Sequence, residues 1–134
     1  MEGMRIEYHR YDIVEAEIKM TETSGSVQKK KRPYVIVGNE IGTTTAPTVI
    51  AMPLTHIIKR TNLPVHGCIS ANSDTSLSFY SMVLGEQAYT LDKKCDIKRK
   101  IGAVVDKKQR NMINKICWNT MFLGENINWE EVLA

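Results

Sequence analysis

Residues 28–55, QKKKRPYVIVGNEIGTTTAPTVIAMPLT, contain two apolar runs rich in β-branched side chains, Tyr34–Val37 and Thr48–Leu54. Such residues favour strands, so both runs predict central strands of a sheet. If the two strands pair antiparallel, the start of the first and the end of the second meet at the same edge of the sheet. Arg32, which precedes the first run, would then lie beside Thr55, which closes the second.

The segments around this pair predict further strands and the loops between them. Short apolar or alternating runs predict strands over 12–18, 63–69, 81–91 and 100–105. Stretches rich in Thr, Ser, Gly and Asn predict loops over 19–31, 39–46 and 70–78. Gly85 inside an expected strand indicates a bulge or a close approach of another segment.

The pattern changes to helical spacing near the C-terminus. Asp106 followed by Gln109 resembles a capping box, apolar residues then recur every three or four positions, and Gly124 is placed to end a helix. We expect an amphipathic helix over 106–123 and a short helix after Asn128. Strands followed by one amphipathic helix describe an α+β, mainly β fold, a small half-open barrel closed by a helix.

The composition limits the class of protein. The 134 residues suit one domain over 1–134, and 43% hydrophobic with 25% charged residues excludes a disordered or fibrous chain. No apolar run approaches the ~20 residues of a membrane span and the N-terminus lacks the apolar core of a secretory signal, so we expect a cytoplasmic protein without a membrane partner. Three widely spaced cysteines predict reduced thiols rather than a disulfide framework or a metal pair.

Positive charge is unevenly distributed along the chain. The net charge is only +3, but basic residues cluster at 29–32, 59–60, 93–94, 98–100 and 107–108. Such clusters fit a polyanionic partner, because neutralising phosphates releases counterions. The same lysines also suit a surface that only keeps the protein soluble, and charge by itself leaves both interpretations open.

Arg32 and Thr55 together are suited to hold a phosphodiester. A guanidinium stays charged and offers a planar fork to two phosphate oxygens, and a threonine hydroxyl can hydrogen-bond to a third group. An arginine is a reluctant proton donor, since its pKa lies above ~12, so an electrostatic role is chemically easier. His56 is a candidate general base by residue type, but successive strand residues face opposite sides, which directs it away from Thr55.

A series of short motifs runs along the chain from the first expected strand to the helix. They are Asp12-Ile13-Val14, Gly25-Ser26, Arg32-Pro33, Asn39, Ala46-Pro47-Thr48, Pro53-Leu54-Thr55, Leu63-Pro64-Val65-His66, Glu86-Gln87, Thr90-Leu91-Asp92 and Lys100-Ile101-Gly102. Their order and spacing resemble the MazF/PemK (Kid) family of toxin endoribonucleases, the mRNA interferases of type II toxin–antitoxin modules. The resemblance covers about 12–123, and 125–134 is a short C-terminal extension.

The resemblance implies an SH3-like small β-barrel of the MazF/PemK/CcdB type with a C-terminal amphipathic helix, a homodimer, and inhibition by a cognate antitoxin. It implies sequence-specific cleavage of single-stranded RNA without a metal or another cofactor. A ribose 2′-hydroxyl attacks the neighbouring phosphate and leaves a 2′,3′-cyclic phosphate and a 5′-hydroxyl. The family's two catalytic residues match Arg32 and Thr55.

Residues near this pair are expected to bind RNA. The predicted contacts are Ser26, Gln28, Lys29, Lys30, Lys31, His66 and Gln87. The three lysines would contact phosphates, and His66 and Gln87 are equally compatible with structural hydrogen bonds. Two positions depart from the family pattern, because Lys29–Lys31 stand where it usually has glycines and Tyr89 stands where it commonly has an arginine.

Two other functions fit the same fold. The first is a non-catalytic toxin that binds a protein target such as DNA gyrase, as some relatives of this fold do. The second is a plain RNA-binding barrel. The presence of both Arg32 and Thr55 argues against the first, and only product analysis separates the second from an endoribonuclease.

Overall fold

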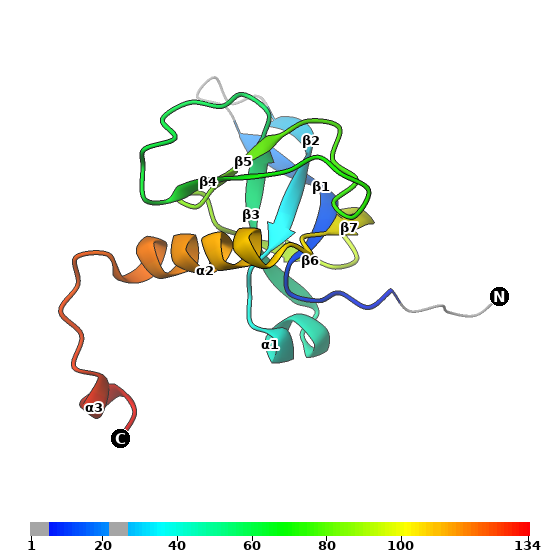
Figure 1. Ribbon diagram of the computed structural model, residues 1–134. Coiled ribbons are helices and arrows are strands. Elements are labelled where there is room, and N and C mark those ends of the chain that lie inside the picture. The colour runs from blue at the N-terminus through cyan, green and yellow to red at the C-terminus, as the bar shows by residue number, and fades with distance from the viewer. Residues whose placement is uncertain (1–5, 22–26) are drawn as a thin grey trace.

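The computed structural model describes the backbone of residues 6–21 and 27–134, and the side chains of 6–18 and 31–134. Seven strands form one antiparallel sheet within these ranges (Figure 1): β1 (Asp12–Thr21), β2 (Val27–Ile36), β3 (Thr48–Thr55), β4 (His66–Ile69), β5 (Ser81–Leu84), β6 (Tyr89–Asp92) and β7 (Ile97–Ala103). The order is β4-β5-β3-β2-β1-β7, and β6 pairs with β3. Because β4 and β7 end this order at opposite edges of the described sheet, the barrel is half-open, as expected.

The antiparallel pairing of β2 with β3 confirms the central prediction. Its register places Tyr34 opposite Pro53 and Ile36 opposite Ala51. Arg32 lies two residues before Tyr34 and Thr55 two residues after Pro53, so both residues lie just beyond the last pair of this register. Pro53, which has no backbone N–H, is the last residue of β3 paired with β2, and the strand continues to Thr55 by pairing with β5.

Buried side chains divide into two cores on opposite faces of the sheet. The helix-side core lies between the sheet and the C-terminal helix and includes Ile13, Val35, Met52, Leu54, Val83, Ile113 and Ile116. The far-side core includes Tyr8, Val14, Tyr34, Ile36, Ala51, Leu91 and Ile97. Neighbouring residues of β2 alternate between the two cores, which is the two-residue period of a strand buried on both faces.

The C-terminal helix α2 (Lys107–Phe122) forms as predicted and crosses the sheet (Figure 1). Asp106 caps it by accepting a hydrogen bond from the Gln109 N–H at 3.0 Å, and Gly124 follows its end with φ of 78°. Only half of the expected capping box forms, because the Gln109 amide donates to Ser70 Oγ at 2.7 Å instead. The short helix α3 (Trp129–Val132) is capped by Asn128. None of the helices described could reach across a lipid bilayer.

Two predicted loops are wrong. The loop expected over 19–31 is largely a ribbon, because β1 continues to Thr21 and β2 begins at Val27, with Lys19 opposite Lys29. A two-stranded ribbon is held by backbone hydrogen bonds, which polar residues form without any apolar alternation. The connection over 39–46 contains a helix, α1 (Glu40–Thr45), whose first turn is capped by Asn39 through a 2.8 Å bond from the Gly42 N–H.

The strand expected over 81–91 is split into β5 and β6 by a turn in which the Gln87 N–H donates to the Leu84 carbonyl at 3.1 Å. Gly85 is a site of close approach, since a Cβ there would lie 2.4 Å from Ile116 Cγ2. The strand expected over 63–69 is confined to β4, and the one expected over 100–105 is β7, three residues earlier at its start.

Gly102 allows the loop between β4 and β5 to lie against β7. The Ala103 N–H donates to the Asp74 carbonyl at 2.9 Å, and a Cβ on Gly102 would lie 2.4 Å from the carbonyl oxygens of Asp74 and Thr75. These are backbone atoms, so the loop would have to shift as a unit. Only glycine therefore fits at this position without distortion.

We expect Gly102→Ala to lower the free energy of unfolding by about 1–3 kcal/mol, the usual cost of overpacking. Urea denaturation of the two proteins measures the difference. Gly38→Ala is the matched control, because a Cβ there would meet its neighbours at no less than 3.4 Å, and it should change stability by no more than about 0.5 kcal/mol. Equal stability of Gly102→Ala and the unmodified protein would contradict the packing described.

Candidate functional site

Arg32 lies within β2 and Thr55 ends β3, and both residues belong to the same face of the sheet. Tyr34 and Ala51 point into the far-side core. Arg32 is two residues before Tyr34 and Thr55 is four residues after Ala51, so strand alternation directs both side chains to that same face. Both side chains are half-buried. Strand alternation therefore gives the two residues a common face of the sheet, and their joint action on one phosphate stays a prediction.

Thr55 is oriented by the backbone that follows it. The Ile57 N–H donates to Thr55 Oγ1 at 3.1 Å, which closes a turn directly after β3. This contact uses one lone pair of the hydroxyl oxygen and leaves its hydrogen able to be donated elsewhere. Thr55 can therefore present a hydrogen-bond donor from a fixed position.

Tyr34 lies near Arg32 on this face and packs against a second tyrosine, Tyr89. Tyr34 is only 3% exposed, and its ring meets that of Tyr89 edge to face at 5.9 Å, across the small side chain of Ala51. Burial raises the pKa of the Tyr34 phenol, and the charge of Arg32 acts in the opposite direction. The phenol consequently stays protonated at neutral pH, as a neutral hydrogen-bonding group close to the guanidinium.

The predicted basic contacts are only partly described. Lys31 is exposed, faces away from Arg32, and its Nζ lies 3.6 Å from Glu15 Oε1. The backbones of Gln28, Lys29 and Lys30 belong to β2. Their side chains, and Ser26 altogether, lie outside the described residues. The RNA contacts assigned to these residues stay predictions.

His66 and Gln87 differ in their surroundings. The His66 side chain is 6% exposed, with Nε2 2.6 Å from Glu86 Oε2 and Nδ1 3.0 Å from the Arg60 carbonyl. Gln87 is exposed. Both ring nitrogens of His66 face oxygen acceptors, and a neutral ring donates a hydrogen bond to one of them at a time. A contact of either His66 or Gln87 with RNA stays a prediction.

A hollow lies on the opposite face of the sheet, next to β2 and β3. We call it the reverse-face hollow; its volume is about 220 Å³, and its walls include Glu15, Pro33, Leu54, His56, Phe79 and Arg99. Pro33 and Leu54 are the chain neighbours of Arg32 and Thr55. His56 turns toward this hollow, as alternation predicts, and its ring lies 5.1 Å from that of Phe79.

Sequence reasoning missed Phe79 and Arg99 as candidate functional residues. One signal was present, because Phe79 and Tyr80 are adjacent aromatic residues that end a polar loop, and they are 61% and 56% exposed. Exposed aromatics in a polar segment are unusual enough to suggest a ligand. Nothing local marks Arg99, which reaches the hollow only through the pairing of β7 with β1.

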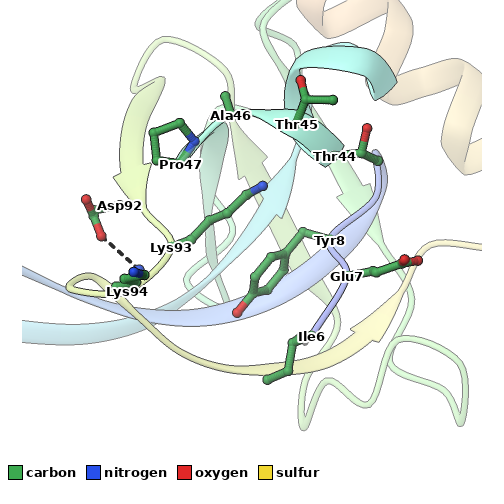
Figure 2. A pocket seen from close by; sticks show the side chains of 10 residues that line it. All are labelled: Ile6, Glu7, Tyr8, Thr44, Thr45, Ala46, Pro47, Asp92, Lys93 and Lys94. Atoms are coloured by element: carbon green, nitrogen blue, oxygen red, sulfur yellow. Dashed lines mark hydrogen bonds between the residues drawn. The ribbon is translucent and has the colours of Figure 1, made fainter. Parts of the chain in front are cut away.

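A larger hollow lies near the other end of β3. Figure 2 shows its walls, and its volume is about 730 Å³. It contains Lys93 and Lys94, and Lys93 Nζ lies 5.9 Å from the centre of the Tyr8 ring. Pro47, in its wall, precedes β3, and the seven steps from Thr48 to Thr55 span about 23 Å at ~3.3 Å each. This hollow is therefore too distant to share a phosphate with Arg32 and Thr55.

Chemically, the edge that carries Arg32 and Thr55 can bind a phosphodiester. The guanidinium supplies a fixed positive charge and paired donors, and the hydroxyl supplies a further donor. Groups held in this way stabilise negative charge that develops on phosphate oxygens during a displacement.

The chain is similar to proteins of one family. Residues 9–119 match the family described as PemK-like, MazF-like toxin of type II toxin–antitoxin system. "Endoribonuclease MazF" of Staphylococcus saprophyticus is 36% identical over 97 residues, which cover 72% of this chain and 79% of that protein.

Solved structures share the fold. An endoribonuclease from a mycobacterial species has a TM-score of 0.67 at 18% identity, covering 94% of this chain and 100% of its own. A mycobacterial endoribonuclease in complex with its cognate antitoxin has a TM-score of 0.62 at 22% identity, covering 85% of this chain and 94% of its own. At these identities the likeness concerns the fold.

The contacts of His66 predict a structural effect. We expect His66→Ala to lower the free energy of unfolding by about 1–3 kcal/mol, because Glu86 and the Arg60 carbonyl each lose a hydrogen-bond partner. Urea denaturation is the measurement, and Gln87→Ala, an exposed neighbour of Glu86, is the control expected to stay within about 0.5 kcal/mol. If the two variants were equally stable, the contacts of His66 would carry no net stabilisation.

Proposed function

The chain belongs to the PemK-like, MazF-like toxins of type II toxin–antitoxin systems, and we propose that it is an endoribonuclease that cleaves single-stranded RNA at a specific sequence. The 36% identical relative named an endoribonuclease supports this activity. The observation that carries the proposal is the β2–β3 register, whose last pair, Tyr34 and Pro53, lies two residues from Arg32 and from Thr55 on the face that both residues share.

The reaction is an internal displacement at phosphorus. The ribose 2′-oxygen loses its proton and bonds to the adjacent phosphorus, while the bond from phosphorus to the 5′-oxygen breaks and that oxygen takes up a proton. The products are a 2′,3′-cyclic phosphate and a 5′-hydroxyl. Water is not consumed, and the step requires no metal ion or other cofactor as a reactant.

Arg32 stabilises the negative charge that grows on the non-bridging oxygens. Its fork matches two of them, and its permanent charge makes it a poor proton shuttle. Thr55 donates its hydroxyl hydrogen to a phosphate oxygen while its own oxygen is held by the Ile57 N–H. Tyr89 takes the place of the arginine that the family commonly has, so a neutral phenol stands where the family commonly has a cation.

The family relationship extends the proposal to partners. We infer that a cognate antitoxin inhibits the protein, as supported by the mycobacterial endoribonuclease solved with its antitoxin. We further infer that the protein acts in the cytoplasm, where its RNA substrate is found, and that it is a homodimer.

Variants of the two catalytic residues test the mechanism. We expect Arg32→Ala to lower the rate of RNA cleavage by about 10²–10³-fold, the usual cost of removing one group that stabilises transition-state charge. Arg32→Lys should recover only part of this loss, because an ammonium keeps the charge without the planar fork. Single-turnover cleavage of an RNA panel in EDTA, with analysis of both product ends, is the measurement.

Thr55 offers a matched pair of variants. Thr55→Ser keeps the hydroxyl and its bond from the Ile57 N–H, and should retain most of the activity, whereas Thr55→Val, of the same shape, should lose at least about tenfold. Circular dichroism confirms that each variant is folded.

Full activity of Arg32→Ala would refute the assignment, and intact RNA with inhibited DNA gyrase would support a protein-binding toxin instead. Salt-dependent RNA binding without products would support a plain RNA-binding barrel.

A further inference from the structure

The reverse-face hollow is built by one row of residues across the sheet. Arg99 of β7 lies opposite Glu15 of β1, and Glu15 lies opposite Pro33 of β2. The adjacent row contains Arg32 opposite Ala16. Because consecutive rows face opposite sides, the hollow and the proposed catalytic pair lie on opposite faces of the sheet.

The wall that contains Phe79 is held in place by hydrogen bonds. Ser81, itself 4% exposed, donates from Oγ to the Phe79 carbonyl at 2.8 Å. Further back in the loop, Thr75 is 1% exposed and donates from Oγ1 to the Ser70 carbonyl at 2.8 Å. The Phe79 ring is therefore exposed on a fixed backbone, which lowers the entropy cost of using it to bind a ligand.

Charges around the hollow suit a nucleotide. Glu15 Oε1 lies 3.3 Å from Arg99 Nε and 3.6 Å from Lys31 Nζ, so two cations surround one carboxylate. Arg99 and Lys31 are more than half exposed and can still contact phosphates, while the carboxylate is an acceptor for N–H groups. An aromatic ring beside cations is the usual platform for a single-stranded base.

The size of the hollow limits the ligand to a fragment. Its volume of about 220 Å³ is below the ~300–1,000 Å³ of pockets that enclose drug-sized molecules. β3 ends at Thr55, and the next residue, His56, lines the hollow, so a chain with a phosphate at Thr55 reaches the hollow by passing around the end of β3. A base in this position is turned out of any stack, which single-stranded RNA permits and a duplex does not.

We propose that the reverse-face hollow binds one unpaired base of the RNA whose phosphate lies at Arg32 and Thr55, with the base stacked on Phe79. This inference rests on the proposed function for the identity of the RNA, and it assigns Phe79, with the adjoining His56, to substrate binding rather than to proton transfer.

Binding of uncleavable oligonucleotides tests the proposal. The probes are a 2′-O-methyl 12-mer of mixed sequence and a 12-mer with the same backbone and no bases, neither of which has a free 2′-hydroxyl to attack phosphorus. The Kd of the 12-mer without bases, divided by the Kd of the 12-mer with bases, measures what the bases contribute to binding. We expect Phe79→Ala to reduce this ratio by about 5–150-fold, the effect of losing one base–aromatic stack. Affinity for the chain without bases should stay unchanged.

Tyr80→Ala is the matched control, because Tyr80 is an equally exposed aromatic residue next in the chain and outside the walls of the hollow. It should leave the ratio as in the unmodified protein. An unchanged ratio in Phe79→Ala would overturn the proposal. If the unmodified protein cleaves ordinary RNA and Phe79→Ala leaves the ratio unchanged, only the base site fails. If the unmodified protein cleaves no RNA but the ratio falls in Phe79→Ala, the base site stands and the proposed activity fails.

Discussion

The antiparallel register of β2 and β3 is the constraint on which the site depends. It sets Tyr34 opposite Pro53, and Arg32 and Thr55 each lie two residues beyond this pair. A slip of one residue would transfer Arg32 to the opposite face of the sheet, because side chains alternate along a strand. Both faces of these strands are packed into cores, so such a slip would also expose apolar side chains. The free energy of burial thus fixes the face on which the proposed catalytic pair lies.

The same alternation separates the two tasks proposed for this edge. Charge stabilisation belongs to the face of Arg32, and base stacking belongs to the face of Pro33, although the two residues are neighbours in the chain. The second face is completed from a distance, by Phe79 from the loop before β5 and by Arg99 from β7. Packing of that loop over Gly102 links the wall of the hollow to the β7 strand. A small sheet edge therefore presents two different chemical surfaces.

The central strands, their antiparallel pairing and the C-terminal helix with its Asp106 cap could be predicted from the sequence, because each follows from local periodicity or turn chemistry. The long ribbon of β1 and β2 could not, since backbone bonds between polar residues leave no periodic signal. The reverse-face hollow was missed for a related reason. His56 and Phe79 are far apart in the chain, and Arg99 reaches Glu15 only across a strand pair. The periodicity of a sequence predicts single strands and helices, but not the contacts between residues that lie far apart in the chain.

The two tryptophans of the chain stack on one another at the C-terminal end. The Trp118 and Trp129 rings lie 5.9 Å apart at 30°, one on α2 and the other on α3. Phe122 contacts both rings, so α3 is joined to the helix by an aromatic cluster. Intrinsic tryptophan fluorescence of this protein is therefore an optical reporter of whether the terminal segment is docked. Both tryptophans belong to α2 and α3 and not to β2 or β3, so their emission reports on the terminal helices rather than on Arg32 and Thr55.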